Sequence, residues 1–345
     1  MQLHTIWFIL IVILWLGFFV LDGFDFGVGA LHMLIGRTDT ERRVVINTIG
    51  PWWDGNEVWL IVAGGAMFAA FPGWYATLFS AGYLALVLVL VALFARGVSF
   101  EYRGKRDDPR WRAGWSWAQT IGSILVPLLL GVALGDLLNG LPINQNHDFT
   151  GDFFDLLTGY GLMTGVTLLT LCLLHGATFL TLRTTGEIRD RARAAGRVIG
   201  LVAIVINVAW VIWTLVVMGG GTVPQPTQIF GVIAVIFAAL LVNTNYNGWA
   251  FASSAFAIAA AIGQIFIALY PNVMVSSTNT AYNLTVNNVV SGHYALVVMT
   301  IVAVLFLPIV LLYQGWSFHV FRQRLSAPPA SAEAPGGGEQ LATQP

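Results

Sequence analysis

Four acidic residues lie in or beside two long apolar stretches of this chain. Asp22 and Asp25 extend the first stretch, and Asp54 and Glu57 open the second. Carboxyl groups at membrane depth are costly and are functional candidates by default. A row of carboxyls that each take up and release a proton is what a proton relay requires. We therefore take these four residues as candidates for a proton or ion path.

The spacing of the first pair predicts an acidic helix face. Asp22 and Asp25 are three residues apart, and Gly29 and His32 continue the same face of a helix. No Lys or Arg is expected inside a span to neutralise these acids. Each must then face water, pair with another polypeptide or hold a proton.

The second pair follows the same spacing but has a simpler alternative role. Asp54 and Glu57 are also three residues apart, with Gly64 continuing their face. Asp54 comes shortly after Pro51, where helix starts favour acidic residues. The acids could therefore cap or cross-link helices near the membrane interface. The residue chemistry alone leaves the proton path and the capping role open.

The composition places these helices in a membrane. Of the 345 residues, 57% are hydrophobic and 10% are charged, with a mean hydropathy of +0.76. About a quarter of the residues in a soluble domain are charged. A net charge of -1 excludes general electrostatic binding to nucleic acid. The single cysteine, Cys172, excludes a disulfide or a thiolate metal cage within the chain.

Apolar runs long enough to cross a hydrocarbon layer, about 20 residues each, recur along the chain. Because open strands would leave backbone polar groups unpaired in lipid, these runs are predicted to be helices. The expected fold is an all-α integral membrane protein, with one polytopic domain over residues 1–325 and a disordered cytoplasmic tail over 326–345. Nine spans are expected, at residues 5–34, 53–71, 75–97, 116–138, 155–182, 198–218, 228–247, 250–270 and 294–318.

The 16 Lys and Arg residues predict the orientation of the chain. They fall in four groups, which follow the first, third, fifth and ninth spans. Basic residues favour the cytoplasmic side, so the amino terminus is expected outside and the carboxyl terminus in the cytoplasm. The four acids then lie toward the cytoplasmic half. Arg96 is counted in the group after the third span, and residues 186–197 are taken as a solvated basic connector.

Glycines at four-residue spacing predict close helix packing. Gly23 and Gly27 form a small-xxx-small pair, and Gly64 is placed with them as a packing position. The surrounding string GFDFGVG is not GxGxxG and does not follow a strand, so it does not indicate a dinucleotide site. A buried His175 could ligate haem iron, but a hydrogen bond to a neighbouring helix is the commoner role.

Four segments resemble subunit II of the cytochrome bd quinol oxidases. The resemblance runs in order along essentially the whole chain apart from the tail, and the block WDGNEVW is highly specific. It implies a fold of two four-helix bundles plus one peripheral helix, in keeping with the nine expected spans. The segments are LDGFDFGVG at residues 21–29, the stretch at 47–72, FEYR at 100–103 and LYPNVMVSS at 269–277.

The resemblance implies a haem-bearing partner, subunit I, which forms a heterodimer with such a chain in the bacterial cytoplasmic membrane. In that family the pair oxidises a membrane quinol, reduces dioxygen to water and takes the protons from the cytoplasm. The partner ligates the haem b and haem d groups, so no haem or metal ligand and no catalytic residue is expected in this chain. The family also leaves room for small accessory membrane subunits and for a structurally bound quinone or lipid.

The family positions make Asp25 and Asp54 the main proton-path candidates, with Asp22 and Glu57 as supporting groups. Some members carry Gln at the position of Glu57, so Glu57 need not be an obligatory carrier. His175 is not a position where a family haem ligand is expected. The implied role of the chain is to support assembly and stability of subunit I and to contribute a cytoplasmic proton-uptake path.

Two other classes of protein stay open at this point. The first is an ion-coupled secondary transporter that uses Asp22, Asp25, Asp54 and Glu57 as its coupling site. Transporters often build such sites from internal repeats, and no corresponding acidic pair appears in the second half of this chain. The second is a structural scaffold whose acids only pack or cap helices.

Overall fold

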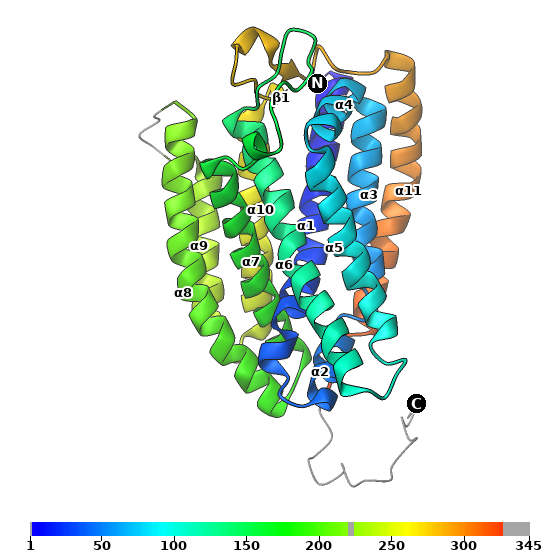
Figure 1. Cartoon of the computed structure of the whole chain (residues 1–345), viewed down its shortest axis with the longest axis vertical. Coiled ribbons are helices and arrows are strands. Elements are labelled where there is room, and N and C mark those ends of the chain that lie inside the picture. The colour runs from blue at the N-terminus through cyan, green and yellow to red at the C-terminus, as the bar shows by residue number, and fades with distance from the viewer. Residues whose placement is uncertain (1, 220–223, 327–345) are drawn as a thin grey trace.

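The computed structural model of the chain describes residues 2–219 and 224–326, which form eleven α-helices and a few short elements (Figure 1). The short elements are η1 (Phe154–Leu156), β1 (Asn272–Met274), η2 (Thr280–Tyr282) and β2 (Leu284–Thr285), and β1 pairs with β2 in antiparallel fashion. The helices are α1 (Leu3–Ile35), α2 (Asp39–Asn47), α3 (Trp53–Ala70), α4 (Pro72–Ala81), α5 (Tyr83–Tyr102), α6 (Pro109–Asn139), α7 (Gly159–Arg183), α8 (Gly186–Val217), α9 (Pro226–Leu241), α10 (Asn247–Leu269) and α11 (His293–Val320).

Each expected span overlaps at least one of these helices, and the fold is all-α as predicted. Among the described residues, seven helices are long and apolar enough to cross a membrane, namely α1, α5, α6, α7, α8, α10 and α11. The remaining expected spans correspond to α3, which has 18 residues, and α9, which has 16. The expected span at 75–97 is divided at Gly82 between α4 and α5. A total of nine crossings therefore stays a prediction.

The stretch 186–197 is helical, which corrects its assignment as a connector. It forms the first three turns of α8, and only Thr184 and Thr185 separate that helix from α7. Gly186 has a positive φ of 61°, which lets the chain turn sharply before the helix begins. The following residues are rich in Arg and Ala, which are good helix formers. The basic residues of this stretch are thus held on a rigid element.

The helices pack in two groups that meet along α7. In the first group α1 contacts α3 and α6, and α5 contacts α6; in the second, α7, α8, α9 and α10 contact one another in turn. Helix α7 joins the groups because it contacts both α1 and α6. A Cβ atom at Gly27 would lie 2.7 Å from the backbone nitrogen of Gly176, and one at Gly131 would lie 2.7 Å from Cα of Gly165. Only glycine permits such close approach of helix backbones.

The four basic groups of the sequence meet at one end of the helix array. Arg103 and Arg112 both form ion pairs with Asp39 of α2, and Arg191 forms one with Glu41 of the same helix. The fourth basic group, which follows α11, lies at the same end, because the backbone of Leu325 is hydrogen bonded to that of Arg183 and Thr185 in the α7–α8 connection. In Figure 1, α2 lies at the opposite end from the amino terminus and the β1–β2 pair. The orientation of these ends across a membrane remains a prediction.

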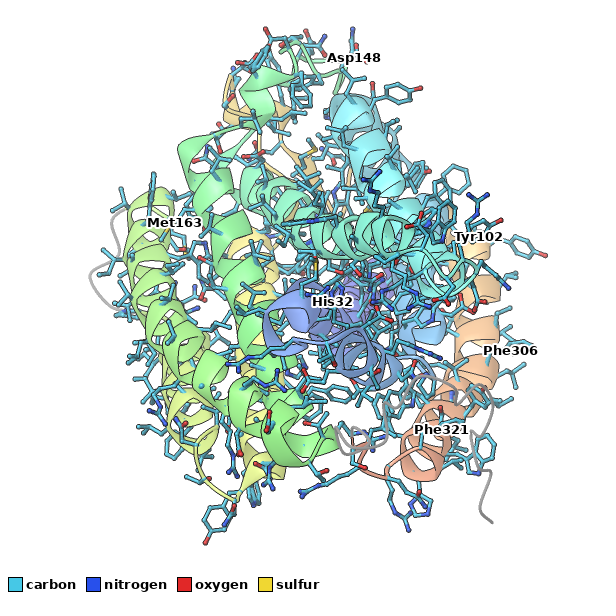
Figure 2. All side chains as sticks on the ribbon, turned by 60° about the horizontal axis from the view of Figure 1, so that its bottom comes forward. His32, Tyr102, Asp148, Met163, Phe306 and Phe321 are labelled. Atoms are coloured by element: carbon cyan, nitrogen blue, oxygen red, sulfur yellow. The ribbon has the colours of Figure 1, made fainter. Side chains whose placement is uncertain are left out.

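Helix α11 lies at the edge of the array. It contacts α1 and α3, and most of its side chains are exposed, among them Phe306 at 60%. Figure 2, which brings the α2 end forward, places Phe306 at the rim of the molecule and His32 of α1 among the central helices. Of the predicted tail at 326–345, only Ser326 is within the described residues.

Candidate functional site

A buried arginine lies at the centre of the acidic cluster. Arg96 of α5 is 0% exposed, and its Nη2 donates to Asp22 Oδ1 at 3.0 Å while its Nη1 lies 3.5 Å from Glu57 Oε2. The prediction that no basic residue neutralises the acids is therefore wrong. The expected span at 75–97 included Arg96, but Arg96 was counted with the basic group that follows the span. Helix α5 continues for six residues beyond Arg96, more than a turn and a half, to Tyr102.

Aromatic rings enclose the guanidinium group of Arg96. Its central carbon lies 4.6 Å from the ring centroid of Phe26 and 5.8 Å from that of Phe100. A desolvated cation over an aromatic face is stabilised by the ring quadrupole. Burial also strengthens the attraction between Arg96 and the carboxylates, because water screens it less. The arginine is thus held firmly between α1 and α3.

The second carboxyl of α1 is bound by amides instead of a cation. Asn56 Nδ2 donates to Asp25 Oδ2 at 2.7 Å and to the carbonyl oxygen of Leu21 at 3.0 Å. Gln314 of α11 donates through Nε2 to Asn56 Oδ1 at 2.7 Å. Oδ1 of Asp25 and Oδ2 of Asp22 have no hydrogen-bond partner among the described residues. Buried polar atoms normally have such partners, so these oxygens are suited to accept a proton or a water.

Asp54 is separated from the other three acids. It lies in the first turn of α3 and is exposed, whereas Glu57, one turn further in, contacts Arg96. Both residues line a cavity of about 600 Å³ between α1, α3, α4, α5 and α6. The lining is mainly apolar and extends to Asp136, in the last turn of α6 at the opposite end of the helices. The structure therefore joins Asp22, Asp25 and Glu57 around Arg96 and leaves Asp54 at one end of the cavity.

Polar side chains continue from this cluster toward the α2 end of the molecule. Ser99, one turn after Arg96, donates to the Arg96 carbonyl at 2.6 Å and also contacts Gln119 of α6. One turn further, Arg103 donates through Nε to Ser116 Oγ at 2.8 Å and pairs with Asp39. The cluster is thus connected to the α2 end by buried polar groups.

Sequence reasoning missed these connecting residues, as it missed Asn56 and Gln314. A signal for them was present in the spacing. Arg96, Ser99 and Arg103 on one helix, and Ser116, Gln119 and Ser123 on the next, recur at three- and four-residue intervals within apolar sequence. That interval defines a polar face on each helix.

His175 forms hydrogen bonds through both ring nitrogens. Nε2 donates to the carbonyl oxygen of Val20 at 3.1 Å, and Nδ1 lies 2.7 Å from Ser254 Oγ. Its ring also stacks on Phe251, with the centroids 4.5 Å apart. This arrangement fits the expected bond between helices and does not fit an iron ligand, which needs one ring nitrogen free. Within the part of the chain that the structure describes, no three His, Cys, Asp or Glu residues cluster as metal ligands do.

The three glycines expected to serve helix packing differ in their surroundings. A Cβ atom at Gly23 would lie 3.3 Å from a methyl carbon of Ile258, and Gly27 is closer still to α7. At Gly64 the nearest atom would be a ring carbon of Phe79 at 3.9 Å, an ordinary contact. The structure therefore gives Gly64 no close helix contact, and instead places it in the lining of the cavity.

Comparisons with known proteins define the class of this membrane protein. The family model described as cytochrome bd terminal oxidase subunit II matches residues 3–321. The chain is 44% identical over 329 residues to cytochrome bd ubiquinol oxidase subunit 2 of Bacillus subtilis, covering 94% of this chain and 97% of that protein. It is 40% identical over 353 residues to cytochrome bd-I ubiquinol oxidase subunit 2 of Escherichia coli K12, covering 92% and 93%.

A solved structure supports the same fold. One chain of the bd oxidase from Geobacillus thermodenitrificans matches with a TM-score of 0.69 and 19% identity, covering 93% of this chain and 99% of that one. The protein is thus one subunit of a haem-containing oxidoreductase complex and a multi-pass protein of the bacterial inner membrane. It belongs to the cytochrome bd oxidase subunit II family, which implies a partner subunit I. The comparisons give the transporter alternative no support.

Proposed function

We propose that this chain supports assembly of the haem-bearing subunit I and delivers cytoplasmic protons to it in a quinol:dioxygen oxidoreductase. The observation that carries the proposal is the cluster of Asp22, Asp25 and Glu57 near Arg96, in which Asp22, Asp25 and Arg96 are buried and Glu57 is partly exposed. Arg96 pairs with Asp22 and Glu57, whereas Asp25 is hydrogen bonded to Asn56 and has no ion pair among the described residues. Acids held in this way at membrane depth are typical of proton relays.

Each residue has a distinct task in the proposed path. Exposed Asp54 takes a proton at one end of the cavity, and Glu57 is the next acid along α3. Arg96 stabilises the ionised forms of Asp22 and Glu57, while Asn56 orients Asp25 through its hydrogen bond. In the assembled complex, haem groups on the partner supply the electron transfer and oxygen reduction. His175 does not fit a haem ligand because both of its ring nitrogens are hydrogen bonded.

The same hydrogen bonds also support an assembly role. Asn56 links α1 to α3, and Gln314 ties α11 to both. A purely structural scaffold would use the acids for these links alone. The two roles make different predictions for variants that keep the shape of the acid but cannot ionise.

The test is to replace Asp25 by Asn and, separately, Asp54 by Asn in the assembled complex. We expect quinol oxidase turnover to fall at least about a hundredfold for Asp25→Asn, a typical loss for a proton-transfer group. The haem b and haem d absorption bands should keep their intensity per complex. Unchanged turnover, or lost haem, would favour the scaffold. The matched control is Glu101→Gln, because Glu101 is an exposed acid at the same end of α5 as Arg96.

We also propose nine crossing helices if α4 and α5 together make one crossing: α1, α3, α4–α5 and α6 form one four-helix bundle, α7–α10 form the other, and α11 lies at the periphery. The helix contacts support this grouping. The amino terminus would lie outside and the carboxyl terminus in the cytoplasm. Cysteines introduced singly into the β1–β2 region and into α2 should react with membrane-impermeant reagents from opposite sides.

The cavity between α3, α5 and α6 supports one further element of the proposal, a structurally bound quinone or lipid. Its lining is apolar along most of its length, with Asp54 and Glu57 at one end and Asp136 at the other. An elongated apolar molecule with a polar head matches such a lining. Organic extraction of the purified complex followed by mass spectrometry should recover the bound molecule in stoichiometric amount.

A further inference from the structure

Three arginines form a row along the first turns of α8. Arg189, Arg193 and Arg197 are four residues apart, so their side chains lie along one face of the helix. The first turns of α8 lie at the end of the molecule that holds α2, because Arg191 of this stretch pairs with Glu41 of α2. That end is the one where the basic residues of the chain gather.

The arginine row is held in place by neutral oxygens of the α9–α10 connection. Arg193 Nη2 donates to the carbonyl of Thr244 at 2.9 Å and to the side chain of Asn245 at 3.1 Å. Arg197 donates through Nε and Nη2 to Asn243 Oδ1 at 3.3 and 3.2 Å.

Arg189 is held in the same way. Its Nη2 lies 2.7 Å from the Asn247 side chain, whose oxygen accepts when that amide is turned to satisfy its neighbours. These bonds orient the guanidinium groups, and their acceptors are neutral oxygens, not carboxylates.

A neighbouring arginine on the same helix shows the contrast. Arg191 forms ion pairs with Glu41 and with Glu187, so its charge is neutralised. Within the described residues, no ion pair is found for Arg189, Arg193 or Arg197, and the adjacent Asp190 makes none either. Three positive charges therefore stand in one row without acidic partners.

An exposed apolar stripe continues the line of the arginines. Leu201 and Val205 follow Arg197 at the same four-residue spacing, and they are 63% and 69% exposed. Val198, beside them, is 63% exposed. In a membrane protein such a face meets lipid chains, with the cationic row at the level of the headgroups. The row and the stripe together match a molecule with an anionic head and a long apolar tail.

We propose that this surface of α8 and the α9–α10 connection is a binding site for an anionic phospholipid. The phosphate is held by the Arg189–Arg193–Arg197 row, and an acyl chain lies along Leu201 and Val205. Arginine suits this task because its guanidinium presents several N–H donors to phosphate oxygens in a fixed plane. Among the residues that the structure describes, hydrogen bonds use one nitrogen of Arg193 and two of Arg197. A free phosphate would use the arginines but not the apolar stripe.

The experiment uses the purified complex of both subunits, stripped of lipid and placed in phosphatidylcholine nanodiscs. Dioleoylphosphatidylglycerol is titrated in, and bound lipid is counted by native mass spectrometry while the thermal midpoint is followed. We expect saturable binding that raises the midpoint. Replacing all three arginines of the row by Gln should weaken binding on the order of a hundredfold, since each basic residue near a membrane surface contributes about fivefold.

A second triple variant controls for net charge. Arg37, Arg43 and Arg110 are exposed at the same end of the molecule, so replacing them by Gln removes the same charge without touching the row. We expect this variant to bind dioleoylphosphatidylglycerol like the wild type. Equal losses in the two triple variants would mean general attraction to an anionic surface and would overturn the site. No preference for phosphatidylglycerol over phosphatidylcholine in the wild type would also overturn it.

Two further measurements cover the remaining outcomes. In the first, inorganic phosphate is added in place of the lipid, and we expect no rise in the thermal midpoint. A rise as large as that given by lipid would mean that the arginine row binds a soluble anion instead. Should the triple variant fail to assemble, Arg197→Gln takes its place, because Arg197 is exposed and its hydrogen bonds within the described residues go to Asn243 alone. We expect about fivefold weaker binding for that variant, and wild-type binding would contradict the proposal.

Discussion

Two buried polar clusters lie on opposite sides of α1, and they differ in charge. The first joins α1, α3 and α5 through Arg96, Asp22 and Glu57. The second joins α1, α7 and α10 through His175 and Ser254. Both arginine and histidine are 0% exposed. Burial alone therefore does not separate the proposed proton path from a cluster that joins helices.

The difference lies in how completely each cluster pairs its polar atoms. Around His175 both ring nitrogens are bound, and Thr178 and Ser254 complete the set of hydrogen bonds. Around Arg96, one carboxylate oxygen each of Asp22 and Asp25 has no partner among the described residues. A fully paired neutral cluster fixes helix positions. An acidic cluster with open acceptors can exchange protons, which is why we assign the function to the first.

The largest effect is expected from removing the cation of the first cluster. Arg96→Leu leaves Asp22 buried without its cation, and breaking a buried pair in this way costs about 3–5 kcal/mol. We expect little assembled complex, measured as haem d absorbance per membrane protein. Arg96→Lys, which keeps the charge, should assemble to a greater extent. Normal haem content in the leucine variant would show that the cluster does not depend on its arginine.

A smaller effect is expected from the second cluster. His175→Leu removes two hydrogen bonds, and the stability of the complex should fall by about 1–3 kcal/mol. Turnover per assembled complex and the positions of the haem bands should not change. Ser254→Ala serves as a matched variant, because it removes one of the same bonds. A shifted haem band in the histidine variant would place His175 beside a haem and contradict its helix-joining role.

The smallest effect is expected where the two halves are joined outside the membrane. Hydrogen bonds from Arg191 of α8 lower the pKa of Glu41 in α2 from 4.5 to about 2. A carboxyl with a lowered folded-state pKa stabilises the protein above its unfolded pKa and loses that contribution as the pH falls toward its folded pKa. Glu41→Gln should therefore lower stability at neutral pH by about 1 kcal/mol.

The pH dependence supplies the check on this pair. The difference in thermal midpoint between wild type and Glu41→Gln should shrink as the pH falls below about 4.5, because Glu41 becomes protonated in the unfolded and then the folded state. High salt at neutral pH should reduce the same difference. A difference that is constant with pH would mean that the variant acts through packing.

The sequence predicted the helices best, because hydrophobicity alone decides where a membrane-spanning helix forms. Long apolar runs predicted the helices because, in lipid, each segment must form its backbone hydrogen bonds internally. Arg96 was missed because a run of apolar residues is expected to end at a charge, whereas α5 carries its arginine inward to partners on other helices. Those partners are 74 and 39 residues away in the chain. No local pattern reveals such pairing.

The acidic residues show the same limit. Helical spacing placed Asp54 and Glu57 on one face, and they do line one cavity. Their environments differ because Asp54 lies in the first turn of α3, at the end of the helix array, while Glu57 lies deeper. The roles of Asn56 and Gln314 depend on α11 meeting α3, which is a property of tertiary packing.

The hydrogen bond from Gln314 to Asn56 also bears on how the chain is made. Synthesis and membrane insertion proceed from the amino terminus, so α1 and α3 enter the membrane long before α11 is translated. The bond that Asn56 accepts from Gln314 cannot form before α11 has been inserted. A chain truncated before Gln314 would retain every acid of the cluster yet lack its final bond. This bond therefore forms only after synthesis has passed residue 314, and it joins a helix made early to one made much later.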